Sequence, residues 1–155
     1  MQLEIGGGTL LTPGFLNLDY IHGSGEWKRY AQDTPWPTGD NTVAAIRASH
    51  VLEHISAGAD RIAVMNEAHR VLKPGGTFEI VVPCVMIENQ MVNGWWAWAD
   101  PDHKSYWAYP HSWLYFTGEF APNADYGIRA WKTLDQENDC HIEMGWEAHV
   151  TLRKP

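Results

Sequence analysis

Three consecutive glycines follow the first predicted strand, and they constrain the fold of this chain more than any other feature. Residues 2–5 have a strand pattern and lead directly into Gly6, Gly7 and Gly8. Glycine lets the backbone turn tightly and lets a nucleotide approach it closely. Such a turn is typical of the nucleotide-binding edge of a parallel sheet, although a purely structural turn uses the same residues.

The rest of the chain alternates between strand and helix patterns. Strands are expected at residues 2–5, 15–19, 27–32, 43–49, 77–83, 128–134 and 148–153. Apolar residues recur at intervals of three and four over residues 60–72, and Lys73 and Pro74 follow with two glycines as helix-stop signals. The pattern predicts an α/β fold with a mostly parallel sheet and an antiparallel C-terminal edge hairpin.

Length and composition limit the classes of protein. The 155 residues fit one domain, residues 1–155, that is long enough to bury a core. A formal net charge of −8 argues against general affinity for nucleic acid or for an anionic membrane. No stretch approaches the roughly 18 apolar residues that span a bilayer, and the N-terminus has no signal-peptide pattern. The two cysteines, Cys84 and Cys140, need no disulfide framework, so a cytoplasmic location is expected.

Two carboxylates follow the second and third predicted strands. Asp19 can accept hydrogen bonds from the hydroxyls of a ribose, and Asp33 stands where an adenine amino group would be read. In a doubly wound sheet both would meet the glycine turn at the carboxyl ends of adjacent strands, where such folds bind ligands. The pattern indicates an adenosine-type ligand, although carboxylates at strand ends are often only solvated caps.

Four segments, in this order, resemble the motifs of class I S-adenosylmethionine-dependent methyltransferases. They are LEIGGG at residues 3–8, PGFLNLD at 13–19, ASHVLEHI at 48–55 and EAHRVLKPGG at 67–76. The likeness is strongest to small uncharacterised members from phage and bacterial genomes, in which a short Pro-Gly turn replaces the first helix. It covers residues 2–83 well, and DPDH at residues 100–103 is similar to an Asp-Pro-x-His element of that group.

The resemblance implies a Rossmann-like, doubly wound sheet with a reversed edge strand, and S-adenosylmethionine as the cofactor. The cofactor-binding residues that it implies are Glu4, Gly6 and Gly8 for the methionine end, Asp19 for the ribose, Asp33 for the adenine, and Ser49 and His50 for the floor. Two residues depart from the family pattern, since Gly7 stands where Cys is frequent and Leu10 where a further Gly is common. The missing first helix also removes a helix start that supports the cofactor.

Methyl transfer needs a nucleophile aligned with the methyl carbon and, for oxygen or nitrogen, a base. His103 is the expected base because it follows the strand after which the chain would cross above the cofactor. Its orienting partner is Asp102 or Asp100, between which the spacing does not decide, and His111 is a reserve candidate. The alternative is a structural turn, because Asp-Pro-Asp-His is good turn chemistry.

Two other groups have weaker chemical interpretations. His50, Glu53 and His54 would share one face of a helix and hint at a metal, but packing beneath the cofactor is the favoured explanation, so no metal is expected. Cys84 follows a strand end and could serve as a nucleophile in pyrimidine methylation. Buried free thiols are common, and we favour that interpretation.

The expected acceptor follows from motifs that the sequence lacks. The Asn-Pro-Pro-Tyr tetrapeptide of amino-methylating DNA enzymes is absent, and SHVL at residues 49–52 stands in its place. We find no target-recognition segment either, so nucleic acid is not expected and a small molecule or a glycan is. Two alternatives stay open: a catalytically silent nucleotide-binding or structural module, and a nicotinamide oxidoreductase. The oxidoreductase would need Gly-x-Gly-x-x-Gly opening a helix, and the turn at Pro13 argues against it.

An aromatic segment at residues 93–116 holds nine of the chain's aromatic residues. Aromatic rings form pocket walls, stack on sugars and bases, and are enriched at subunit interfaces. The segment is therefore interpreted as part of a substrate pocket, as a contact that forms a homo-oligomer, or as both.

Overall fold

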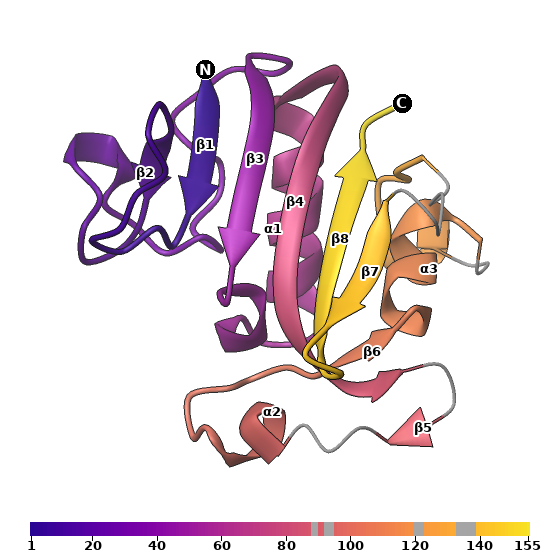
Figure 1. Ribbon diagram of the computed structural model, residues 1–155. Helices are drawn as coiled ribbons and strands as arrows, with labels where there is room; N and C mark the ends of the chain where they lie inside the picture. Colours follow the sequence, from indigo (N-terminus) through magenta and orange to yellow (C-terminus); the bar gives the residue numbers. More distant parts are fainter. Residues whose placement is uncertain (88–89, 92–94, 120–122, 133–138) are drawn as a thin grey trace.

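A single mixed sheet organises the computed structural model, which describes residues 1–87, 90–91, 95–119, 123–132 and 139–155 (Figure 1). The main path of the sheet has the order β2 (Leu16–Leu18), β1 (Gln2–Ile5), β3 (Val43–Ser49), β4 (Leu72–Ile87), β8 (Glu147–Arg153) and β7 (Cys140–Glu143). Two short strands, β5 (Gln90–Met91) and β6 (Trp107–Tyr109), pair with the C-terminal part of β4.

The strand directions confirm the predicted doubly wound α/β fold. β2, β1, β3 and β4 are parallel, and the order reverses at β1, since β2 lies on one side of it and β3 on the other. β8 runs antiparallel to β4, and β7 runs antiparallel to β8, which forms the predicted C-terminal edge hairpin. The carboxyl ends of β1 and β3 therefore meet at the reversal, where open α/β sheets bind ligands.

Helix α1 (Ala59–Val71) confirms the predicted helix and lies behind the sheet in the view of Figure 1. The other helical segments are short: α2 (Trp95–Ala99), α3 (His111–Thr117), and the 3-10 turns η1 (Gly25–Trp27), η2 (Leu52–His54) and η3 (Asn123–Tyr126). No helix joins β1 to β2, because residues 6–15 form turns and bends, as expected from the Pro-Gly segment. Within the described ranges, no helix has the length and apolar character needed to cross a membrane.

The core lies between the sheet and α1. Side chains alternate along the strands, so Phe78 and Ile80 of β4 are buried in the same cluster as Val64 and Met65 of α1. On the opposite side of β4, Glu79 is exposed. This asymmetry explains why the strand patterns of the sequence alternate.

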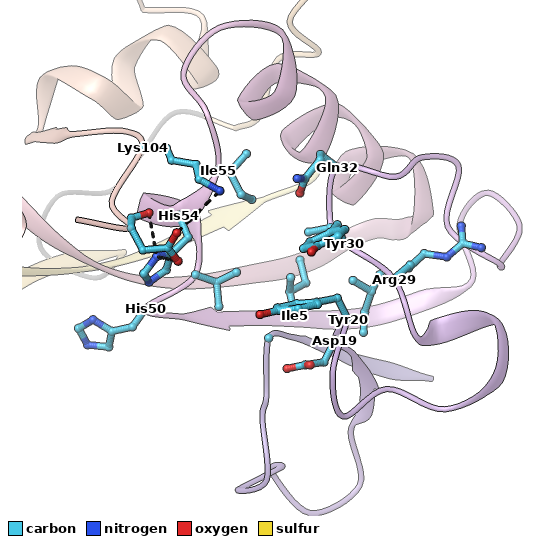
Figure 2. Close-up of a pocket in the computed structure, with 15 residues that line it drawn as sticks. Ile5, Asp19, Tyr20, Arg29, Tyr30, Gln32, His50, His54, Ile55 and Lys104 are labelled. Carbon is cyan, nitrogen blue, oxygen red and sulfur yellow. Dashed lines mark hydrogen bonds and ion pairs between the residues drawn. The ribbon is translucent and has the colours of Figure 1, made fainter. Parts of the chain in front are cut away.

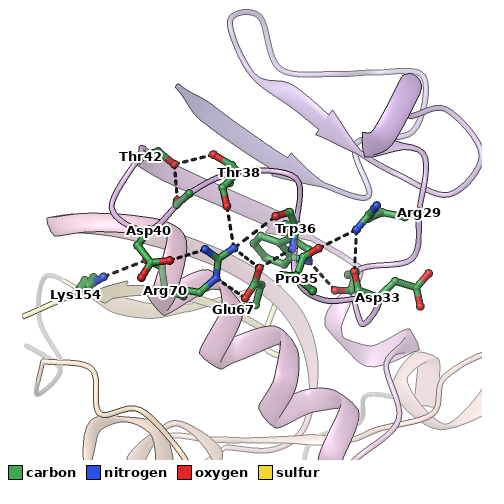
Figure 3. A network of polar contacts seen from close by, with 12 residues as sticks. Arg29, Asp33, Pro35, Trp36, Thr38, Asp40, Thr42, Glu67, Arg70 and Lys154 are labelled. Atoms are coloured by element: carbon green, nitrogen blue, oxygen red, sulfur yellow. Dashed lines mark hydrogen bonds and ion pairs between the residues drawn. The ribbon is translucent and has the colours of Figure 1, made fainter.

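A network of polar contacts around Arg70 ties the loop before β3 to α1 (Figure 3). Glu67 accepts hydrogen bonds from Arg70 at 2.6 and 2.8 Å and from the backbone N–H of Trp36 at 2.6 Å. Arg70 also donates to the carboxylate of Asp40 at 2.6 Å and to the carbonyl of Thr38 at 3.0 Å. We call these five residues the Arg70 network. Its hydrogen bonds, above all that to Glu67, outweigh partial burial and raise the pKa of Arg70.

The predicted strand at residues 27–32 is wrong. η1 ends at Trp27, and the chain then turns so that the N–H of Asp33 donates to the carbonyl of Tyr30 at 3.1 Å. The apolar residues of this segment pack locally instead of pairing in the sheet. Ala31 accepts a hydrogen bond at 2.8 Å from the indole of the buried Trp36.

The predicted strand at residues 128–134 is wrong for residues 128–132, and residues 133–134 lie outside the described part of the chain. Trp131 is buried and its ring contacts His69 and Phe78, with centroids 5.2 and 6.1 Å apart, so the apolar pattern reflects core packing. The hairpin partner of β8 is β7, which begins at Cys140. The reversed strand is thus β8, with β7 at the edge beyond it.

Candidate functional site

The glycine turn closes the C-terminal end of β1 against β2 and η2. Gly6 donates its N–H to the carbonyl of Leu18 at 2.8 Å and has a φ of +65°. A Cβ on Gly6 would collide with Cγ2 of Val51, so both the backbone conformation and the close approach require glycine here. Gly8 donates its N–H to Oδ2 of Asp19 at 3.1 Å, which joins the turn to the end of β2.

Asp19 is held by backbone donors on both of its carboxylate oxygens. Oδ1 accepts hydrogen bonds from the N–H groups of Ile21 at 2.7 Å and His22 at 2.8 Å, and Oδ2 accepts the one from Gly8. Partial burial acts to raise the pKa of Asp19, but the three N–H donors outweigh it and hold the pKa below its usual value. The carboxylate is therefore ionised at neutral pH.

A first pocket of about 340 Å³ opens beside this turn, at the carboxyl ends of β1 and β3 (Figure 2). Three of the predicted cofactor residues line it: Gly6, Asp19 and His50. The predicted ribose and turn residues thus meet at one cavity. Tyr20 and Tyr30, which no motif of the sequence indicated, also line the pocket and stack on each other with ring centroids 4.5 Å apart.

The other predicted cofactor residues lie outside the lining of the first pocket. Glu4 is buried and accepts a hydrogen bond from the N–H of Thr12 at 2.7 Å, so it braces the glycine loop. Gly8 donates its N–H to the carboxylate of Asp19, and Ser49 is the last residue of β3. The three residues before Asp33 line the pocket, but Asp33 itself does not.

A second pocket, of about 470 Å³, adjoins the first. Its lining residues are His50, Pro83, Ala99, Asp100, Pro101, His103 and Trp146. His50 belongs to both pockets and so stands between them. Trp146 was not predictable as a pocket residue, because it reaches this pocket from the turn between the two strands of the C-terminal hairpin.

His50 is held between two carboxylates. Its Nε2 lies 2.5 Å from Oε1 of Glu147, and its Nδ1 lies 3.4 Å from Oε1 of Glu53. The hydrogen bond with Glu53 raises the pKa of His50, partial burial opposes it, and Glu147 adds to the rise. The backbone of His50 has a φ of +54°, which is uncommon for a residue with a side chain.

The structure separates the two carboxylates that were alternatives for pairing with His103. Nε2 of His103 lies 3.7 Å from Oδ2 of Asp100, whereas Asp102 has its Oδ2 3.2 Å from Nδ1 of His54. The reserve candidate His111 begins α3 and lines neither pocket. Cys84 is buried, and that burial raises its pKa to about 12, so the thiol is not an activated nucleophile.

The aromatic segment divides into buried and exposed parts. Trp107 and Trp113 are fully buried and stack with ring centroids 4.3 Å apart, so they belong to the core. Trp98, Tyr106 and Tyr115 are exposed. Among the described side chains of residues 93–116, no aromatic ring lines either pocket. The expectation that the segment walls a substrate pocket therefore finds no support among these described rings.

A family model described as a methyltransferase domain matches residues 18–115. The chain belongs to this family. It is a class I methyltransferase domain that uses S-adenosylmethionine and transfers a methyl group to an acceptor. No curated protein sequence matches it.

Solved structures share the fold of this methyltransferase domain at low sequence identity. The YcgJ protein of Bacillus subtilis is 13% identical, covers 99% of this chain and 91% of its own, and has a TM-score of 0.59. A possible histamine N-methyltransferase of Thermotoga maritima is 12% identical, with coverages of 99% and 82% and a TM-score of 0.61. The 1,6-didemethyltoxoflavin-N1-methyltransferase of Burkholderia thailandensis, solved with S-adenosylhomocysteine, is 13% identical, with coverages of 99% and 70% and a TM-score of 0.59. At these identities the likeness establishes the fold.

Proposed function

We propose that the first pocket binds S-adenosylmethionine and that the second pocket binds the methyl acceptor. The observation that carries the cofactor assignment is the ionised Asp19 beside the glycine turn, in a cavity at the reversal of the sheet. The acceptor assignment rests on His50, which lines both cavities. A methyl group can then pass from one pocket to the other over a short distance, as in-line transfer requires.

The residues of the first pocket fit an adenosine-type ligand. A carboxylate offers about four acceptor positions, and backbone N–H groups use three of them on Asp19, so a further one is open to a ribose hydroxyl. Tyr20 and Tyr30 offer aromatic faces against which an adenine ring can pack. Gly6 brings bare backbone to the cavity wall, which allows a ligand to approach closely.

In methyl transfer the protein binds the cofactor and the acceptor, orients them toward each other and excludes water. When bound, S-adenosylmethionine supplies a methyl group on a positively charged sulfur. Glu53 and Glu147 fix the ring of His50 at the boundary of the pockets, so the ring separates cofactor from acceptor in one orientation. His103 and Asp100 line the acceptor side and are the groups that we assign to contact with the acceptor.

The proposed acceptor is a small molecule or a glycan. The volume of the second pocket suits a compact ligand, and its lining combines the ring of Trp146 and two prolines with the polar groups of His50, Asp100 and His103. A flat apolar surface flanked by hydrogen-bonding groups suits a sugar or a polar ring. Oxygen or nitrogen on such a ligand is the nucleophile that a histidine-lined pocket would handle.

Calorimetric titration with S-adenosylhomocysteine tests the cofactor assignment. We expect the wild type to bind and Asp19→Ala to bind about 10–100-fold more weakly, because a hydrogen bond to a charged group contributes about 1.5–3 kcal/mol. Asp19→Asn keeps an acceptor oxygen, so its affinity for S-adenosylhomocysteine should fall less than that of Asp19→Ala. The matched control is Asp33→Ala, a carboxylate outside the lining, which should change the affinity less than about twofold.

Two results would overturn the proposal. If the folded wild type does not bind S-adenosylhomocysteine, the first pocket is not a cofactor site. If Asp19→Ala binds as tightly as the wild type, the ribose assignment fails. Circular dichroism on each variant separates these results from a loss of folding.

A further inference from the structure

Glu53 carries a buried oxygen that the cofactor assignment does not explain. The residue lies in η2 and is 1% exposed. Its Oε1 faces His50, whereas its Oε2 is buried and has no hydrogen-bond partner among the described residues. Because an unpartnered buried carboxylate oxygen is costly, and nearly all buried polar groups are satisfied, this atom points to a missing ligand.

Two histidines stand beside the carboxylate of Glu53. The rings of His54 and His103 meet edge to face with centroids 4.8 Å apart. One potential ligand atom from each of Glu53, His54 and His103 lies within 4.8 Å of the others. Ligands of a tetrahedral zinc ion, with bonds of about 2.0–2.2 Å, are about 3–4 Å apart, so a small closure of the side chains would complete the site.

Hydrogen bonds to the backbone already orient the two rings. Because a carbonyl accepts, Nδ1–H of His103 donates to the carbonyl of Ala97 at 3.1 Å, and in the neutral ring the lone pair is then on Nε2. Nδ1 of His54 lies 3.3 Å from the backbone carbonyl oxygen of Asp102 and 3.2 Å from its carboxylate oxygen Oδ2. Histidines that bind metals are typically fixed in this way, by a carbonyl or carboxylate on the other ring nitrogen.

We infer that Glu53, His54 and His103 bind a divalent cation of the zinc class. Two imidazoles and one carboxylate form a donor set typical of catalytic zinc, with a further coordination position open. His54 lines the first pocket and His103 lines the second, so the cation would sit at the passage between them. In this role His103 is a ligand, in place of the base that the sequence predicts.

The position of the cation narrows the acceptor class, and this step rests on the proposed function. A cation beside the second pocket favours an acceptor with a hydroxyl group, because it lowers the pKa of an oxygen that approaches it. The hydroxyl gives its proton to solvent, and its oxygen forms the new bond to the methyl carbon. The electron pair of the broken carbon–sulfur bond returns to sulfur, which leaves neutral S-adenosylhomocysteine.

Metal titration of the chelator-treated protein, without cofactor, tests the site. We expect Zn²⁺ to bind with a micromolar or tighter dissociation constant in calorimetry, and Co²⁺ to give the visible absorption of a tetrahedral site. Glu53→Gln and His103→Ala should each weaken binding at least 10-fold. The matched control is His141→Ala, from the exposed group of His141, Glu143 and His149, and it should bind as the wild type does.

Two outcomes would overturn the inference. One is that the wild type binds neither metal. The other is that His141→Ala abolishes binding while Glu53→Gln and His103→Ala retain it, since the ion would then occupy the hairpin. If Glu53→Gln fails to fold, His103→Ala decides alone, because the ring of His103 lines the wall of the second pocket and the substitution leaves no charge buried.

The same variants separate this inference from the proposed function. His103 does not line the first pocket, so His103→Ala should bind S-adenosylhomocysteine as the wild type does. Cofactor binding without metal binding overturns only the cation site. Metal binding that depends on Glu53 and His103, without cofactor binding, supports the cation site while the proposed function fails.

Discussion

The Arg70 network and the group around Glu53 both bury a carboxylate beside the same sheet, but they differ in how that carboxylate is satisfied. Glu67 uses both of its oxygens, with Arg70 and the N–H of Trp36 as donors (Figure 3). Glu53 uses one oxygen toward His50 and leaves the other buried without a partner among the described residues. Hydrogen bonds within the protein account for the burial of Glu67, so its role is structural. A buried carboxylate oxygen that lacks such bonds and lies next to two pockets indicates a ligand.

The largest expected effect is the loss of stability when the carboxylate of Glu67 is replaced, compared with that of Glu53. Glu67→Gln should lower the free energy of unfolding by about 3 kcal/mol, because it removes the charge that pairs with Arg70 and turns an amide NH2 toward a hydrogen-bond donor in a partly buried site. The affinity for S-adenosylhomocysteine should not change under conditions where the variant is folded. Urea unfolding followed by tryptophan fluorescence measures the loss.

Glu53→Gln is the matched change in the other group. Without metal it should lose far less stability than Glu67→Gln, because it removes a buried charge that lacks full compensation. Equal losses for the two variants in metal-free buffer would show that the comparison is mistaken. Asp40→Asn, at the exposed rim of the Arg70 network, should lose much less than Glu67→Gln.

A smaller effect is expected from two glycines of the same turn. Gly6→Ala would force a Cβ into Val51, a residue that also lines the first pocket, so both stability and cofactor affinity should fall. Gly8→Ala meets no atom within 4 Å and should cost only the left-handed backbone strain, about 1 kcal/mol. In calorimetry, Gly6→Ala should have a much lower affinity for S-adenosylhomocysteine than Gly8→Ala. The reverse order of affinities would argue against the first pocket as the cofactor site.

The smallest effect concerns the pH dependence of stability through His50. Because its pKa is raised in the folded protein, its stabilisation is fully present below the unfolded value near 6.5 and is lost as the pH rises through the folded pKa. His50→Gln should therefore reduce stability at acidic pH more than at alkaline pH. The ring is partly exposed, so the difference should stay below about 1 kcal/mol. Thermal unfolding across pH 5 to 9 measures it, and an equal loss at all pH values would contradict the assignment.

Sequence patterns predicted the parts of the molecule that depend on local chemistry. The strands around the glycine turn, helix α1 and the position of Asp19 at the pocket were all predictable, because periodicity and turn residues report them directly. The conformation of residues 27–32 was not predictable from the pattern, because their side chains pack on neighbouring loops and not across a sheet.

The parts that depend on distant contacts were not predictable from the sequence. His50 and Glu147 are 97 positions apart, and nothing in either segment indicates that they meet. The choice between Asp100 and Asp102 as partner of His103 also needed the fold, because spacing permits both. The aromatic count misled for a related reason, since Trp107 and Trp113 are core residues whose burial no local pattern reports.

The absence of a helix between β1 and β2 has a consequence for the order in which this protein folds. The contacts that shape the ribose side of the first pocket span only 8 to 11 positions, from Glu4 to Thr12, Gly7 to Asn17 and Gly8 to Asp19. Loops of that size close quickly, whereas the contact from His50 to Glu147 closes a loop of 97 positions. We therefore expect the nucleoside side of the site to form early in folding and the acceptor side to form last.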